Sequence, residues 1–373
     1  MTRRTSPLRR FTLALTVACA AAPVAPCLVP SAAALPLYAS RQGATCVTCH
    51  VDPNGGGIRN EVGFAYLRNR HSIERESKWE KVTVDPKLND WITLGVDLRV
   101  MYYASHVNGG RTLSTSTFFP MQGQVNLAVM PHEHLTLVAS HGITVDEPGV
   151  PAGYVAREIY GMVEGLPAEM YARIGRFRLP FGLRQDDHTS FTRDQDFLPY
   201  DSQKPDAGIE VGRIGTAWFA QGSFVNNDEP LVSRAETFAA KVGHASESFQ
   251  FGLSGLHKYY NDVLWSLYAS ATRGRLSALG EYAGGTLGPY VKRNETAFFA
   301  ELDYRVLRGL NVRAKLDYAD LDRDGPGGLK RRYLGEVDIN PIPFVEAKIS
   351  YRYYDSEDSG IHKDYLALFY FPF

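Results

Sequence analysis

The chain has 373 residues, and its 40 basic and 41 acidic side chains leave a net charge of −1. This balance lacks the basic excess on which nucleic-acid binding depends, so no nucleic-acid partner is expected.

Residues 1–34 have the pattern of a secretory signal peptide. Four arginines come first, residues 11–22 are apolar, and Ala32–Ala34 offers a small-residue cleavage site. The apolar run is too short to stay as a transmembrane helix, and no later stretch of about 18 apolar residues supplies one. Removing this leader removes Cys19, Cys27 and four positive charges, so the expected mature chain keeps two cysteines and a net charge of about −5.

The two remaining thiols stand in a Cys-x-x-Cys-His run. Cys46 and Cys49 have the spacing at which thiols add to the two vinyl groups of a haem, and the imidazole of His50 follows as an axial ligand of the iron. The motif therefore predicts one covalently attached haem c. The alternative is a disulfide or redox-active cysteine pair that happens to precede a histidine.

The motif lies in a small segment, residues 35–75, which is too short to build a core unaided. A covalent haem would supply the missing apolar centre. Electron-transfer haems usually take a second axial ligand, either Met or His. No Met occurs between residues 51 and 100, so His71 is the nearest candidate for the distal ligand, although it could equally be a solvated surface histidine. Residues 76–89 are charged and aperiodic, and we interpret them as a linker.

From residue 90 onward the hydrophobic period is two. In residues 91–101, five aliphatic side chains share one face, while Asp97 and Arg99 lie on the other. The same alternation returns over residues 298–306, 310–318 and 345–353. A soluble β-sandwich or barrel would also alternate. Segments of roughly 10 to 14 residues with aromatic ends instead favour an all-β outer-membrane barrel of about 16 antiparallel strands over residues 90–373.

Connection lengths fit this barrel, because short periplasmic turns should alternate with longer outer loops. An even strand number places the haem segment in the lumen or on the periplasmic side. The longest outer loop, residues 179–206, is expected to fold into the lumen as a constriction. It is either a solvated polar loop or a weak site for a hard cation such as iron, with the candidate ligands Asp186, Asp187, His188, Asp194 and Asp196.

The leader, the single Cys46–His50 motif and the barrel together resemble the fused monohaem cytochrome–porin family of outer-membrane iron-oxidase-like cytochromes. Residues 176–182, before the long loop, also resemble the phosphate-selective porins. The first resemblance implies haem attachment at Cys46 and Cys49 with His50 as axial ligand. The residues after the motif depart from the family's usual Pro and Leu spacing, since Pro53-Asn54-Gly55-Gly56-Gly57 stands there.

This resemblance also implies a location and partners. The chain would lie among the lipids of the outer membrane of a Gram-negative bacterium. It would pass electrons between an extracellular donor or acceptor, such as ferrous iron, and a periplasmic c-type cytochrome or other carrier. Alternatives are a diffusion porin with a haem-bearing plug and a haem peroxidase-like enzyme with an open distal position. No catalytic triad, phosphate loop or paired-histidine motif stands out elsewhere, so the sequence assigns no catalytic residue, and extracellular iron-oxidase activity is one option.

Overall fold

The computed structural model describes residues 37–42, 44–74, 85–108, 113–143, 154–185, 187, 189–193, 205–215, 217–226, 237–258, 262–287, 293–325, 328–357 and 360–372. They all belong to one compact unit, Ser31–Phe373. The expected signal peptide lies outside the described residues, as does most of the expected linker. No helix of the described part is long and apolar enough to span a membrane.

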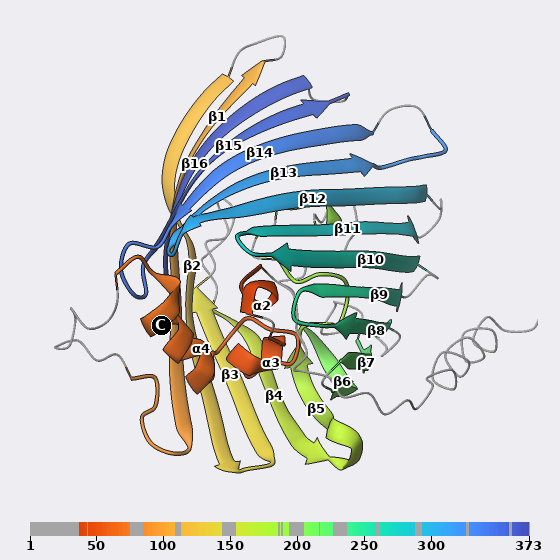
Figure 1. Ribbon diagram of the computed structural model, residues 1–373. Helices are drawn as coiled ribbons and strands as arrows, with labels where there is room; N and C mark the ends of the chain where they lie inside the picture. The colour runs from red at the N-terminus through yellow and green to blue at the C-terminus, as the bar shows by residue number, and fades with distance from the viewer. Residues whose placement is uncertain are drawn as a thin grey trace, which may run out of the picture. The chain divides into compact units, whose positions relative to one another are not determined.

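Sixteen antiparallel strands form a closed barrel (Figure 1). Each strand pairs with the next along the chain, and β16 pairs with β1 to close the ring. The predicted all-β fold of about 16 strands is confirmed. The strands are β1 (Ile92–Asn108), β2 (Leu113–His132), β3 (Leu135–Ile143), β4 (Tyr154–Leu166), β5 (Met170–Phe177), β6 (Asp206–Ile214), β7 (Trp218–Val225), β8 (Thr237–Ala245), β9 (Phe249–Lys258), β10 (Asp262–Arg273), β11 (Leu276–Leu287), β12 (Arg293–Leu307), β13 (Leu310–Asp320), β14 (Leu329–Ile339), β15 (Glu346–Ser356) and β16 (Gly360–Pro372).

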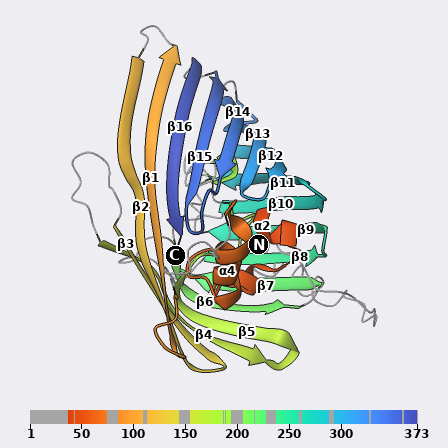
Figure 2. The ribbon, with the colours of Figure 1, turned by 60° about the vertical axis from the view of Figure 1, so that its left-hand side comes forward.

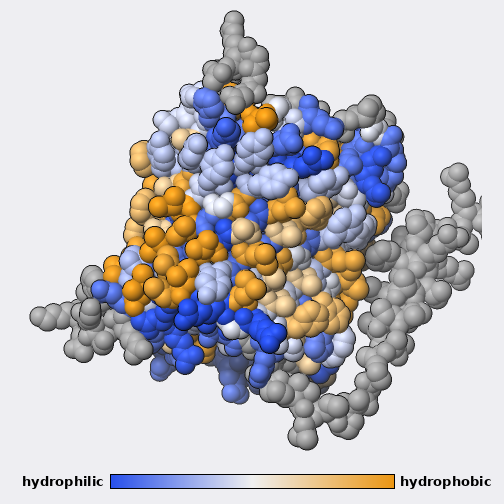
Figure 3. Space-filling model, turned by 45° about the horizontal axis from the view of Figure 1, so that its top comes forward, coloured by the Kyte–Doolittle hydropathy of each residue, from blue (hydrophilic) through white to orange (hydrophobic). Residues whose placement is uncertain are grey.

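The two faces of the sheet are reversed relative to a soluble barrel. In β1 the residue Asp97 is 5% exposed, whereas its neighbour Leu98 is 41% exposed. Successive strand residues point to opposite faces, so this alternation turns polar groups into the lumen and apolar groups outward. Figure 3 shows the resulting band of apolar side chains across the outside of the strands. An apolar belt around a polar lumen is the pattern expected of a barrel in lipid.

Short and long connections lie at opposite ends of the barrel. At one end only two residues separate β10 from β11 and β12 from β13, whereas at the other β5 ends at Phe177 and β6 begins at Asp206. The antiparallel order places the start of β1 and the end of β16 at the short-turn end, where Asp97 lies opposite Pro372. Most connections follow the predicted alternation, but at the short-turn end six residues join β14 to β15, while at the other end only three join β9 to β10 and β15 to β16.

The N-terminal segment forms short helices inside the ring of strands: α2 (Leu37–Gln42), α3 (Cys46–Cys49), α4 (Glu61–Tyr66) and the π-helical turn η1 (Leu67–His71). Figures 1 and 2 both place α2 and α4 within the curve of the sheet. The segment leaves the lumen at the short-turn end, where the backbone N–H of Ile73 donates to the carbonyl of Asn340 (2.7 Å) and Arg308 donates to the carbonyl of Ile73 (2.6 Å).

The described part of the long loop after β5 also enters the lumen and includes the short 3₁₀ helix η4 (Phe191–Arg193). Its Phe181 packs in one buried apolar cluster with Ile58 of the N-terminal segment and with Phe177 at the end of β5. A second short 3₁₀ helix, η3 (Pro167–Glu169), forms the turn between β4 and β5. The buried core is thus assembled in the lumen from wall, segment and loop together.

Candidate functional site

The Cys-x-x-Cys-His motif forms a single helical turn that local hydrogen bonds hold in place. The backbone N–H of His50 donates to the carbonyl of Cys46 (2.9 Å), which closes the turn α3. His50 itself is extended and pairs with Arg59, while the N–H of Asn60 donates to the carbonyl of Cys49 (3.1 Å). Both thiols and the imidazole are therefore presented from one short, clamped stretch of backbone.

A glycine turn follows the motif and folds back onto it. Gly55, Gly56 and Gly57 all have positive φ, at 82°, 71° and 59°, a region that side chains with a Cβ disfavour. A Cβ on Gly55 would lie 3.0 Å from the Sγ of Cys46, and one on Gly56 would lie 2.3 Å from a guanidinium nitrogen of Arg184. The departure from the family spacing noted in the sequence thus allows the lumen loop to contact the motif closely.

The motif and the candidate distal ligand line one cavity of about 270 Å³. Cys46, Cys49, His50 and His71 all border it, together with Tyr66, Leu279 and Phe299. His71 comes from η1, after α4, so the two histidines reach the cavity from separate elements. This volume lies just below the range of roughly 300–1,000 Å³ that small-molecule sites usually have.

Burial controls the protonation of the groups in the cavity. It lowers the pKa of His50 and of His71 to about 4, so both imidazoles are in the neutral, metal-binding form at neutral pH. It raises the pKa of Cys46 to about 11, and both cysteines are thiols rather than halves of a disulfide. The Nδ1 atoms of His50 and His71 are buried and have no hydrogen-bond partner among the described residues.

These features fit a covalent haem. The site offers two thiols at the required spacing, two neutral imidazoles with an unpaired ring nitrogen each, and aromatic and aliphatic side chains for packing. A buried polar atom without a partner costs roughly 1–3 kcal/mol, a cost that a bound metal would remove. The ring of His71 is further held edge-on by Tyr38, with ring centroids 4.7 Å apart.

Charged side chains anchor the motif to the barrel wall. Asp52, two residues after His50, accepts a hydrogen bond from Arg173 of β5 (3.2 Å) and from the backbone N–H of Asn54 (2.7 Å). Arg173 is fully buried, pairs with Glu210 of β6 (2.9 Å) and lies over the ring of Phe177 (4.3 Å). The sequence analysis missed Asp52 as a site residue, because the Asp-Pro-Asn-Gly sequence at this point indicates a turn but not the contact with Arg173.

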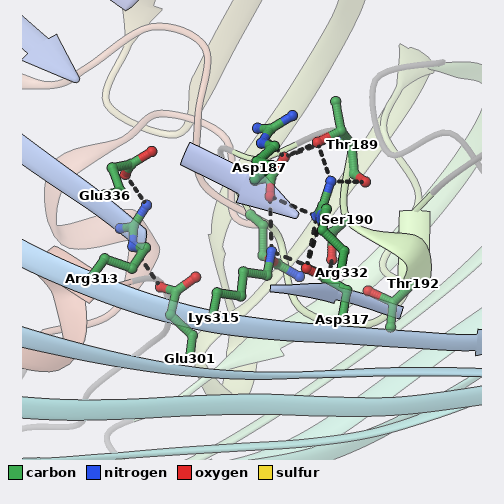
Figure 4. Close-up of polar contacts among 12 residues, drawn as sticks. Asp187, Thr189, Ser190, Thr192, Glu301, Arg313, Lys315, Asp317, Arg332 and Glu336 are labelled. Atoms are coloured by element: carbon green, nitrogen blue, oxygen red, sulfur yellow. Dashed lines mark hydrogen bonds and ion pairs between the residues drawn. The ribbon is translucent and has the colours of Figure 1, made fainter. Parts of the chain in front are cut away.

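A second charged network holds the lumen loop (Figure 4). Asp187 pairs with Lys315 of β13 (3.0 Å) and Arg332 of β14 (3.2 Å), and Arg332 also binds Asp317 (2.8 Å). Ser190 donates to Asp317 (2.8 Å), so the network ties the loop to two strands.

This network also bears on the expected cation site. Asp187 is occupied by cationic side chains, and the other candidate ligands, Asp186, His188, Asp194 and Asp196, lie outside the described residues. No group of three or more potential metal ligands occurs in the described part of the chain.

No family model and no curated protein matches the sequence. Solved structures do match. OmpT of Vibrio cholerae has a TM-score of 0.59 at 10% identity over 78% of this chain and 100% of its own. The fold is that of the outer-membrane porins. An anion-selective porin from Comamonas acidovorans has a TM-score of 0.61 at 8% identity, over 76% of this chain and 99% of its own. OprB of Pseudomonas putida has a TM-score of 0.59 at 8% identity, over 83% of this chain and 100% of its own.

Proposed function

We propose that this protein is an outer-membrane barrel whose lumen is closed by a segment carrying one covalent haem c, and that it passes electrons across the membrane. The observation that carries this proposal is the convergence of Cys46, Cys49, His50 and His71 on a single lumen cavity. The porin fold supports the location, because an apolar belt of this kind is stable only in lipid.

The residues would divide the work as follows. Cys46 and Cys49 would form the two thioether bonds, His50 would be the proximal ligand and His71 the distal ligand. A haem held in this way supplies an iron that takes up and releases one electron. A filled distal position favours electron transfer over the peroxidase-like alternative, which needs an open one.

The position of the segment indicates which partner would meet each end. The segment leaves the lumen at the short-turn end, which faces the periplasm in outer-membrane barrels, so a periplasmic c-type cytochrome or similar carrier would dock there. The external donor or acceptor, with ferrous iron as the candidate suggested by the family resemblance, would approach from the long-loop end. A haem in the lumen would lie part of the way across the apolar band, which is about 25 Å tall in such barrels.

Haem attachment is tested on the denatured protein. After export in a host that matures c-type cytochromes, the purified chain should keep its haem stain on a denaturing gel and give the alkaline pyridine spectrum of a haem with two thioether bonds. The double variant Cys46→Ala/Cys49→Ala should give neither. A wild-type chain without covalent haem, produced beside a control cytochrome that is matured normally, would overturn the proposal.

A diffusion channel is the second candidate, and the comparisons support it more directly, because the similar structures are porins and outer-membrane proteins. The lumen is lined by polar and ionisable groups such as Arg313, Glu301 and Lys315, which would favour water and ions if the segment moved aside. The segment and the loop both lie in that lumen, so we expect low conductance from the intact protein in planar bilayers. Wide, steady channels from the intact protein would favour the diffusion channel.

A further inference from the structure

Two neighbouring short turns and the end of the N-terminal segment carry only basic charges. The stretches are η1 with the two residues after it (residues 67–73), the β10–β11 turn with its flanking residues (273–276) and the β12–β13 turn with its flanking residues (305–310). Together they hold six arginines and no carboxylate, although the expected mature chain is acidic overall. These arginines form the arginine patch: Arg68, Arg70, Arg273, Arg275, Arg305 and Arg308.

Contacts between the three stretches make the patch continuous. Arg308 donates to the carbonyls of Asn69 (3.5 Å) and Ile73 (2.6 Å), which joins the β12–β13 turn to the N-terminal segment. Arg275 donates to the carbonyl of Val306 (3.0 Å), which joins the two turns to each other. The patch is therefore one surface at the short-turn end of the barrel.

Much of this positive charge is open to solvent. Arg70, Arg273 and Arg275 are exposed, and none of the three pairs with a carboxylate among the described residues. Short turns elsewhere at the same end carry carboxylates, namely Glu133, Glu169 and Glu247. The positive charge is thus concentrated in the sector of this end where the N-terminal segment leaves the lumen.

The patch also adjoins the cavity that the Cys-x-x-Cys-His motif lines. Arg308 binds backbone carbonyls on both sides of His71, which borders this cavity. Arg70 belongs to the segment inside the ring of strands, whereas membrane lipid surrounds the outside of the ring. A soluble partner is therefore a better match for the patch than lipid phosphates, and it would sit outside the cavity on the His71 side.

We propose that the arginine patch docks an electron carrier with an acidic surface, an inference that rests on the proposed function. Opposite charges steer two proteins together and raise their association rate. The docked carrier would exchange one electron with the haem, so that oxidation of the iron from Fe(II) to Fe(III) reduces the carrier by one electron, or the reverse. The carrier is thus defined by its carboxylates as well as by its redox centre.

The test measures electron transfer from the full-length ferrous protein in detergent to plastocyanin, a copper protein with a patch of surface carboxylates. Haem Fe(II) would reduce Cu(II) to Cu(I), and stopped-flow absorbance gives the second-order rate constant. Arg70→Gln/Arg275→Gln should lower this constant about tenfold at an ionic strength of about 0.01 M, where the Debye length is about 30 Å. The difference should disappear at about 1 M, where that length is about 3 Å. Arg275→Glu, which alters the wall and not the haem segment, should act in the same way.

Two controls separate docking at the patch from a general charge effect. Arg213→Gln/Arg331→Gln also removes two positive charges, but β7–β9 separate Arg213 from the patch and Arg331 lies at the long-loop end, so the rate should stay at the wild-type value. Plastocyanin with amidated carboxylates should react slowly with the wild-type protein. If the patch variants carry covalent haem and react at the wild-type rate, as they would if the patch bound only lipid phosphates, the inference is wrong while the proposed function stands. A wild-type chain without covalent haem would overturn both.

Discussion

Truncation of Asp52 should release the N-terminal segment from the barrel wall while leaving the barrel folded. Asp52→Ala removes the acceptor of the Arg173 guanidinium (3.2 Å) and of the Asn54 N–H (2.7 Å). The side chains of Asp52 and Arg173 are 3% and 0% exposed, so solvent cannot replace the lost partner. Glu210 remains paired with Arg173 (2.9 Å), which reduces the free-energy cost of losing Asp52.

The size of the effect follows from this geometry. Breaking a buried ion pair by removing one partner costs about 3–5 kcal/mol, and the remaining Glu210 points to the lower end, about 3 kcal/mol. At 1.4 kcal/mol for each factor of ten, the equilibrium between docked and undocked segment should shift by roughly 150-fold. The barrel should not respond, because its strands are held by their own hydrogen-bonded ladder.

Amide hydrogen exchange with mass spectrometry of the detergent-solubilised protein measures this shift. Peptides covering residues 44–60 should exchange roughly 100-fold faster in Asp52→Ala, while peptides from β10 and β11 should be unchanged. Glu169→Ala is the matched control, because it removes an exposed ion pair with Arg213 (3.2 Å) at a short turn. Equal protection of residues 44–60 in Asp52→Ala and wild type would refute the reasoning.

The remaining predictions concern the haem motif and the loop. Cys46→Ala/Cys49→Ala should lose covalent haem but keep the heat-modifiable gel mobility of a folded barrel, and loss of that mobility would mean that segment and barrel fold as one. His71→Ala should raise carbon monoxide binding by the ferrous haem, and an unchanged spectrum would remove His71 from the site. The ordinary pKa of an aspartate is about 3.9. Burial raises the pKa of Asp187, but Lys315, Arg332 and Arg352 lower it by more, so the pKa lies well below the ordinary value. The stabilisation is therefore complete above about pH 5 and is lost as the pH falls below that value, so protection of the loop from external protease should be constant from pH 7 to 5, and a loss within that range would contradict the assignment. Deletion of residues 35–89 should raise ionic conductance, and equal conductance would show that the segment does not close the lumen.

The barrel could be predicted because strands and turns are indicated by residues that are neighbours in the sequence. Alternation along β1 sorts Asp97 from Leu98 without reference to any distant residue, and glycine, proline and polar residues mark the turns. Repeating that pattern over the chain predicted the strand number and most of the alternation of short and long connections. One-dimensional periodicity was sufficient because every strand neighbours the next in sequence.

The cavity could be predicted only in part. The Cys46–His50 motif is contiguous and could be recognised from its spacing, and elimination of Met singled out His71. Asp52 contacts Arg173, which is 121 positions away in the chain, and pairs with Arg184, which is 132 positions away. Sequence patterns contain no signal for such pairings, because they depend on where the loop and the segment meet in the lumen.

Electron transfer across a sealed membrane tests the central claim most directly. Proteoliposomes would enclose ferric cytochrome c, and the external reductant would be ferrous iron on a chelator coupled to dextran, which is too large to pass the lumen. The wild-type protein should reduce the enclosed acceptor, whereas Cys46→Ala/Cys49→Ala, inserted to the same density, should not. Equal rates for the two proteins, or no reduction by a wild-type protein that carries covalent haem, would contradict the account.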